Sequence, residues 1–100
     1  MSLTEITQGL SERVAKNGAI AGKVVVFDFG DDGLVRIDGK ADPATVSNDA
    51  GDADCRVKVT IADFTDIAAG KQNAQMAFMM GKLKVEGDMG IAMQLGKILG

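Results

Sequence analysis

Apolar and polar residues recur with two different periods along the chain, and the period separates the expected helices from the expected strands. In residues 3–16 the apolar side chains return every three or four positions, which predicts an amphipathic helix. Ser2 and Glu5 have the spacing of a capping box, and Asn17-Gly18 is a typical helix end. The apolar stripe of this helix consists of Leu3, Ile6, Leu10 and Val14.

Strand patterns follow this first helix. Residues 22–29 are rich in β-branched and aromatic side chains, and residues 34–38 repeat that character. The sequence Gly-Asp-Asp-Gly at residues 30–33 is typical of a turn, so the two runs together predict a β-hairpin. A further short strand is expected at residues 44–47, directly after the only proline of the chain.

The second half of the chain changes period three more times. Residues 55–61 and 82–86 alternate apolar with charged or polar positions, which predicts strands with one face exposed to water, as in antiparallel and mixed sheets. Short helical stretches are expected at residues 63–69 and 74–80. A final helix is expected over residues 88–99, with the aspartate at its start as the cap.

This order of elements predicts an α+β fold. One helix comes first, three or four strands follow, and two short helices, a strand and a helix complete the chain. Helices placed outside a run of strands are typical of a helical layer that covers one face of a sheet. No repeat or linker divides the 100 residues, so we expect one domain over residues 1–100, with a single hydrophobic core.

Composition excludes several classes of function. The net charge of −3 and the sequence pI near 4.7 lack the basic footprint of a protein that binds nucleic acid. The chain has no histidine, so Ser-His-Asp and Cys-His nucleophiles cannot form and zinc loses its commonest nitrogen ligand. We therefore expect no enzyme activity, no cofactor and no metal. A loose divalent-cation site at Asp49, Asp52 and Asp54 is a remote alternative to solvated turn residues.

The chain ends and the cysteine content predict a cytoplasmic protein. No apolar run approaches the 18 residues that span a bilayer, residues 1–5 show no secretory signal, and the last four residues are not a peroxisomal address. The single cysteine, Cys55, cannot form an internal disulfide. Its alternation with Val57 favours a small buried hydrophobe over a nucleophile.

Methionine and glycine are concentrated in the last quarter of the chain. Apart from Met1, every methionine lies between residues 76 and 93. Methionine is flexible and polarizable, which suits a surface that must fit several apolar shapes. A glycine inside a helix costs about 1 kcal/mol relative to alanine, so Gly90 and Gly96 indicate a packing or ligand constraint. The pattern favours an adaptable apolar pocket, and methionines that fill gaps in a small core are the alternative.

The same region resembles a known family. Residues 77–93 read A-F-M-M-G-K-L-K-V-E-G-D-M-G-I-A-M and resemble the signature of the sterol carrier protein-2 family, also called non-specific lipid-transfer proteins. Ala53-Asp54-Cys55, Asp63-Phe64 and Gly70-Lys71 also stand in the order that the family shows. The resemblance runs over residues 22–99. It implies a five-stranded mixed or antiparallel sheet with helices on one face, enclosing an apolar tunnel for fatty acids, fatty acyl-CoAs or sterols.

The resemblance also implies which residues meet the lipid. The expected cavity residues are Phe64, Met76, Phe78, Met79, Met80, Leu83, Met89, Ile91, Met93 and Leu95. The last 30 residues hold four lysines against two acids, so a lysine there is expected to hold a lipid head group or to contact a membrane surface transiently. The head-group candidates are Lys82, Lys84 and Lys97, and a plain solvated face is the alternative.

Two functions follow from these observations. The first is a monomeric lipid-binding or lipid-transfer domain that performs no chemical step. The second is a protein-interaction module. From Met89 to Leu99 only Gln94 and Lys97 are strongly polar, which is a wider apolar arc than a core helix needs. Such a helix could dock on a partner or on an enzyme domain.

Overall fold

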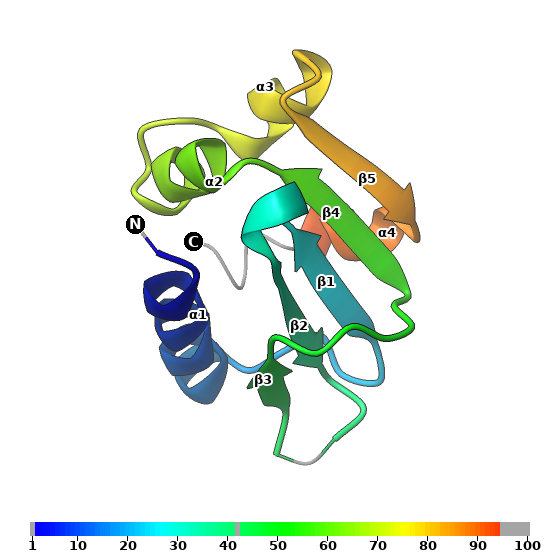
Figure 1. Cartoon of the computed structure of the whole chain (residues 1–100). Coiled ribbons are helices and arrows are strands. Elements are labelled where there is room, and N and C mark those ends of the chain that lie inside the picture. Colours follow the sequence, from blue (N-terminus) through cyan, green and yellow to red (C-terminus); the bar gives the residue numbers. More distant parts are fainter. Residues whose placement is uncertain (1, 42, 95–100) are drawn as a thin grey trace.

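The structure, a computed structural model, describes residues 2–41 and 43–94 (Figure 1). A long helix begins the chain, strands form its middle, two short helices precede the last strand and a third follows it. The elements are α1 (Leu3–Asn17), β1 (Val24–Asp28), the 3-10 turn η1 (Gly30–Asp32), β2 (Leu34–Asp38), β3 (Thr45–Ser47), β4 (Cys55–Val59), α2 (Ile61–Ala68), α3 (Ala74–Met79), β5 (Leu83–Gly87) and α4 (Met89–Gln94).

All five strands form one mixed sheet in the order β3-β2-β1-β4-β5. The central pair, β1 and β4, is parallel, with Phe27 opposite Val57, and the other three pairs are antiparallel. A parallel pair needs a crossover connection, which here consists of β2, β3 and the loop up to residue 54. The expected single five-stranded sheet is confirmed, and it is mixed.

The helices cover one face of this sheet, as the sequence predicts. Only alternate residues of the strands belong to the core cluster. The pairing register of the strands places these residues opposite one another, so they lie on the same face of the sheet. Residues from each of the four α-helices complete the cluster, so the α+β prediction is confirmed. The sheet supplies Val25, Phe27, Val35, Ile37, Cys55, Val57, Val59 and Leu83, and the helices supply Ile6, Leu10, Val14, Phe64, Ile67, Ala77 and Ile91.

The opposite face of the sheet is charged. Arg56 Nη1 lies 3.2 Å from Asp28 Oδ2, and Lys58 Nζ lies 2.9 Å from Glu86 Oε1. Val26 is fully buried on this face, between two arginines at the paired positions of β2 and β4. The apolar stems of long cationic side chains cover such a residue while their charged ends stay in water.

The structure differs from the expected boundaries at two places. Ile61, expected as the last residue of a strand, is the first residue of α2, because the Thr60 hydroxyl accepts the backbone N–H of Asp63 at 3.1 Å and caps the helix. Strand β1 begins at Val24 because Gly22, at φ +74°, forms a turn and donates its N–H to the Gly39 carbonyl at 2.9 Å.

The remaining boundaries agree to within one or two residues. The capping box of Ser2 and Glu5 is present, and Asp88 caps α4 by accepting the Gly90 N–H at 2.8 Å. The helix expected over residues 88–99 is described only as far as Gln94, so Leu95 and Lys97 lie outside the described residues.

Candidate functional site

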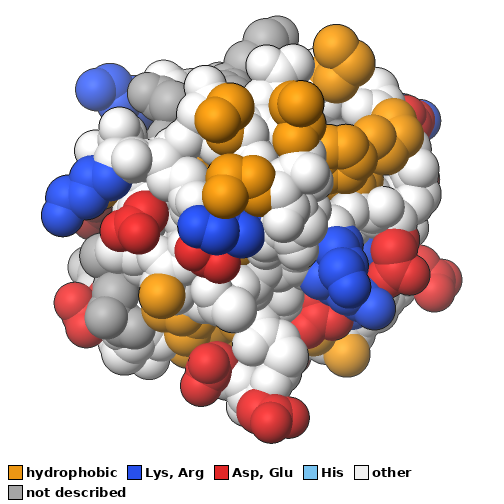
Figure 2. Space-filling view, turned by 90° about the horizontal axis from the view of Figure 1, so that it is seen from above, with side chains coloured by type: hydrophobic (Ala, Val, Ile, Leu, Met, Phe, Trp, Pro, Cys, Tyr) orange, Lys and Arg blue, Asp and Glu red, His pale blue; other side chains and the backbone are white. Residues whose placement is uncertain are grey.

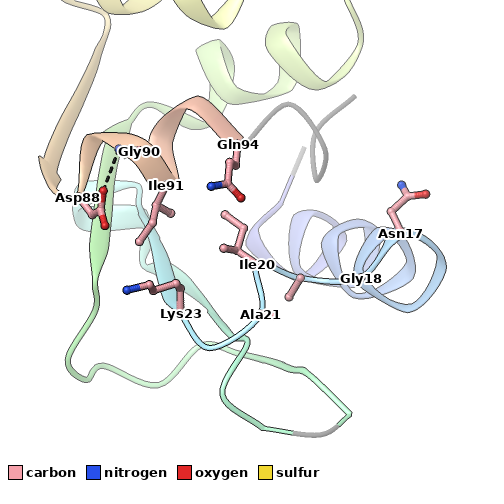
Figure 3. A pocket seen from close by; sticks show the side chains of 10 residues that line it. Asn17, Gly18, Ile20, Ala21, Lys23, Asp88, Gly90, Ile91 and Gln94 are labelled. Atoms are coloured by element: carbon pink, nitrogen blue, oxygen red, sulfur yellow. Dashed lines mark hydrogen bonds between the residues drawn. The ribbon is translucent and has the colours of Figure 1, made fainter.

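A cavity of about 480 Å³ lies between the α1–β1 loop and α4 (Figure 3). Residues 17–21 and Lys23 form one side of it, and Asp88, Gly90, Ile91 and Gln94 form the other. Its volume falls within the range of about 300–1,000 Å³ that is usual for small-molecule sites. Residues from the two ends of the chain therefore create a space large enough for a ligand.

The loop side of the cavity is fixed to the sheet by backbone hydrogen bonds. Lys23 donates its N–H to the Ile20 carbonyl at 3.1 Å and accepts the Gly39 N–H at 2.8 Å. A Cβ at Gly39 would overlap the Ile20 carbonyl oxygen, so only glycine lets the turn between β2 and β3 approach this closely. The loop is thus held by contacts that tie it to another part of the chain.

The α4 side combines a polar rim with an apolar base. Ile91 is buried and belongs to the core cluster, whereas Asp88 and Gln94 are exposed. Figure 3 shows Ile91 pointing toward Lys23, and Ile20 and Gln94 pointing toward each other across the cavity. The lining thus offers isoleucine side chains for an apolar group, and an ammonium, a carboxylate and the Gln94 amide for a polar one.

The thiol of Cys55 lies in the core rather than in the lining of the cavity. Cys55 is fully buried on β4, and burial raises the pKa of its thiol, with the negative charge of Asp88 adding to the effect. Because the thiolate is the reactive form, a raised pKa keeps the group inert at neutral pH. The structure therefore supports the interpretation of Cys55 as a small core residue.

Asp54 joins three strands next to the cavity. Its carboxylate accepts the Val24 N–H at 2.8 Å, its own N–H donates to the Val24 carbonyl, and its carbonyl accepts the Asp88 N–H at 2.9 Å. The hydrogen bond from Val24 lowers the pKa of the Asp54 carboxyl, against a smaller effect of desolvation, and the charges of Lys40 and Lys23 lower it further. The carboxylate is thus engaged with the backbone at the start of β1.

We expect Asp54→Asn to lower the free energy of unfolding at pH 7 and to lose that effect in acid. The folded-state pKa lies below the unfolded value, so the ionised carboxylate stabilises the fold above pH ~4, and this contribution disappears as the pH falls through the folded-state pKa. Urea titrations of wild type and variant between pH 7 and pH 3 measure the difference. Asp31→Asn, at an exposed position of η1, is the control, and a pH-independent difference for Asp54→Asn would contradict the prediction.

The structure distributes the expected cavity residues over two environments. Phe64, Leu83 and Ile91 are buried in the core, and of these only Ile91 lines the cavity. Lys82 and Lys84 are exposed and lie outside its lining. Contact of the remaining residues with a ligand stays a prediction. The exposed cavity candidates are Met76, Phe78, Met79, Met80, Met89 and Met93, with 42–83% of their surface accessible.

The α1–β1 loop is the part of the site that the sequence pattern did not identify. Its signal is the apolar run Ala19-Ile20-Ala21 between a helix end and a turn glycine, since Ala19 and Ile20 are partly buried against the core. Loops exposed to water are usually polar, so an apolar run at this place indicates a loop that packs against the core. Lys23 comes two residues after this run, within the strand expected over residues 22–29.

Within residues 2–41 and 43–94, no helix has the length and apolar character needed to cross a membrane. The same residues contain no group of three or more cysteine, aspartate or glutamate side chains placed to hold a metal ion.

The curated proteins to which the chain is similar include a lipid-transfer protein of about its own length and several much longer proteins. Non-specific lipid-transfer protein-like 1 of Caenorhabditis elegans is 34% identical over 102 residues, which cover 94% of this chain and 86% of that protein. Hydroxysteroid dehydrogenase-like protein 2 of Xenopus laevis is 47% identical over 62 residues, and human sterol carrier protein 2 is 49% identical over 43 residues. These matches cover 62% and 43% of this chain, but only 13% and 8% of those longer proteins.

Solved structures and a family profile agree with these relatives. The sterol carrier protein domain 2 of Helicoverpa armigera superimposes with a TM-score of 0.78 at 25% identity, over 95% of this chain and 83% of that domain. The Aedes aegypti sterol carrier protein-2 in complex with palmitate gives a TM-score of 0.68 at 20% identity, over 100% and 97% of the two chains. The profile of the SCP-2 sterol transfer family matches residues 4–100, so the chain belongs to this family.

Proposed function

We propose that this chain is a lipid-binding and lipid-transfer domain that holds one fatty acid in the cavity between the α1–β1 loop and α4. The observation that carries the proposal is the lining itself, with Ile20 and Ile91 beside the space and the Lys23 ammonium at its rim. An apolar chain and an anionic carboxylate match these two features. A related fold, the Aedes aegypti sterol carrier protein-2, was solved with palmitate.

Affinity for fatty acids should rise with acyl length until the cavity is full. Each methylene that leaves water contributes at most about 0.8 kcal/mol, which is roughly fourfold in the dissociation constant. Displacement of a fluorescent fatty acid by saturated acids of increasing length measures this slope. Equal affinity for eight-carbon and sixteen-carbon acids would argue against an enclosed acyl site.

Replacing Lys23 by glutamate should weaken fatty-acid binding by up to about fivefold, because an exposed ion pair is worth about 0–1 kcal/mol. A fatty alcohol of the same length carries no charge and should bind the variant almost as well as wild type. Lys82→Glu and Lys84→Glu are the matched comparison, since these lysines lie outside the cavity lining. A larger loss of fatty-acid affinity in either of them than in Lys23→Glu would move the head group away from Lys23.

We further propose that the domain acts as a monomer and that it catalyses no reaction. The second part is supported by Cys55, the single cysteine, which is buried and whose thiol has a raised pKa. A reducing compartment such as the cytosol suits this free cysteine. Native mass spectrometry of freshly purified protein tests the first part. A monomer with the added mass of a fatty acid supports the proposal. A ligand-free dimer would instead support the protein-interaction module, the alternative that the family membership does not favour.

A further inference from the structure

Helix α3 exposes most of its apolar side chains. Of its residues only Ala77 is buried, and it anchors the helix to the core. Figure 1 shows α3 at one end of the molecule, and Figure 2 shows apolar side chains gathered on the surface seen from that end. We call Met76, Phe78, Met79 and Met80 the α3 knob, and their side chains are exposed by 56%, 42%, 79% and 62%.

The segment of the chain that carries the α3 knob is basic although the whole chain is acidic, and Asp63 of α2 lies beside it through a hydrogen bond from Gln72 Nε2 at 3.4 Å. The segment from residue 67 to residue 85 contains no aspartate or glutamate, and its charged residues are Lys71, Lys82 and Lys84. All three lysines are exposed, and none forms an ion pair with a carboxylate of the described residues. Among the described residues, the hydrogen-bond partner of Lys82 Nζ is an amide oxygen, Gln72 Oε1, at 3.4 Å. These ammonium groups are therefore available to an anionic partner.

We propose that the α3 knob inserts into the surface of an anionic lipid bilayer, with Lys71, Lys82 and Lys84 on the phospholipid head groups. Apolar side chains flanked by cations are the chemistry of interfacial membrane binding. The α3 knob lies on a short helix at the end of the molecule, and three of its four side chains are flexible methionines. Such side chains can insert into a deformable bilayer, which needs no groove of matching shape. The inference rests on the proposed function and adds the surface with which lipid is exchanged.

Flotation with vesicles tests this assignment. The 100-residue chain should bind vesicles of phosphatidylcholine and phosphatidylglycerol and bind pure phosphatidylcholine weakly. Met79→Ser should reduce binding to the anionic vesicles about tenfold, because an apolar side chain no longer leaves water. Lys71→Ala should reduce it about fivefold. The matched controls are Met93→Ser on α4, where the side chain is 83% exposed, and Lys40→Ala in the β2–β3 loop, and both should bind as wild type does.

A single tryptophan reports the depth of insertion. The chain contains no tryptophan, so Phe78→Trp introduces one reporter in the α3 knob. Its emission should shift to shorter wavelength on anionic vesicles and be quenched by brominated acyl chains. Lys40→Trp, at the other end of the molecule, should show neither effect. An unshifted and unquenched Phe78→Trp would overturn the proposal.

The variants also separate this inference from the proposed function. Lys71→Ala should retain wild-type affinity for a fatty acid in vesicle-free solution, whereas Lys23→Glu should retain wild-type docking on vesicles. Absence of fatty-acid binding together with intact docking would overturn only the proposed function. Equal losses of docking in Met79→Ser and Met93→Ser would overturn the inference. The inference would also be overturned if the protein did not bind vesicles and formed a dimer that Met79→Ser dissociates. The α3 knob would then be a contact between two copies of the chain.

Discussion

Replacing Phe64 by alanine is expected to lower the free energy of unfolding by about 3–5 kcal/mol. The Phe64 ring is 4% exposed and lies edge-on to the rings of Phe27 and Phe29, each with a centroid separation of 5.3 Å. Truncation removes both aromatic contacts and leaves a void between α2 and the centre of the sheet. Because a domain of this size is stable by about 5–15 kcal/mol, this loss is a large share of the whole free energy of unfolding.

Urea denaturation followed by circular dichroism measures this loss, and Phe78→Ala is the matched control. Phe78 is 42% exposed in the α3 knob, so its truncation should change the free energy of unfolding by less than about 1 kcal/mol. The comparison also tests the expectation that Phe64 lines a lipid cavity. A loss below 1 kcal/mol in Phe64→Ala, restored by added fatty acid, would show that the ring faces ligand rather than core.

The elements that could be predicted from the sequence are those fixed by local chemistry. The capping box of Ser2 and Glu5 and the apolar alternation around Val57 depend on a few neighbouring residues, and the structure confirms both. The pairing of β1 with β4 depends on residues about 30 positions apart. Their direction could not be read from either strand alone, so the sequence left the choice between an antiparallel and a mixed sheet open.

The cavity was harder to predict for the same reason. Its walls come from residues 17–23 and 88–94, and neither segment shows by itself that the other lies opposite. The methionines were recognised as an adaptable apolar group, but composition does not show which way a side chain faces. Of the six residues of α3, only Ala77 is buried against the core. The bulky neighbours of Ala77 therefore remain on the surface.

Saturation with a fatty acid is expected to stabilise the protein by about 2.7 kcal/mol at a hundredfold excess over the dissociation constant. For a domain of this length each kcal/mol raises the melting temperature by about 4–8 °C, so the increase should be roughly 10–20 °C. Differential scanning calorimetry of delipidated protein with and without palmitate measures it. Lys23→Glu should show a smaller increase at the same total palmitate concentration, because a weaker complex is less saturated.

Amide hydrogen exchange at the walls of the cavity tests the same prediction at the level of individual residues. The cavity opens to solvent and polar residues line it, among them Lys23, Asp88 and Gln94, so water occupies it when no fatty acid is bound. A bound fatty acid would replace this water and contact the α1–β1 loop and α4 together. Palmitate should therefore slow amide hydrogen exchange in residues 18–23 and 89–94 more than in β4. If saturating palmitate changes neither the melting temperature nor this exchange pattern, the fatty acid does not bind between the α1–β1 loop and α4.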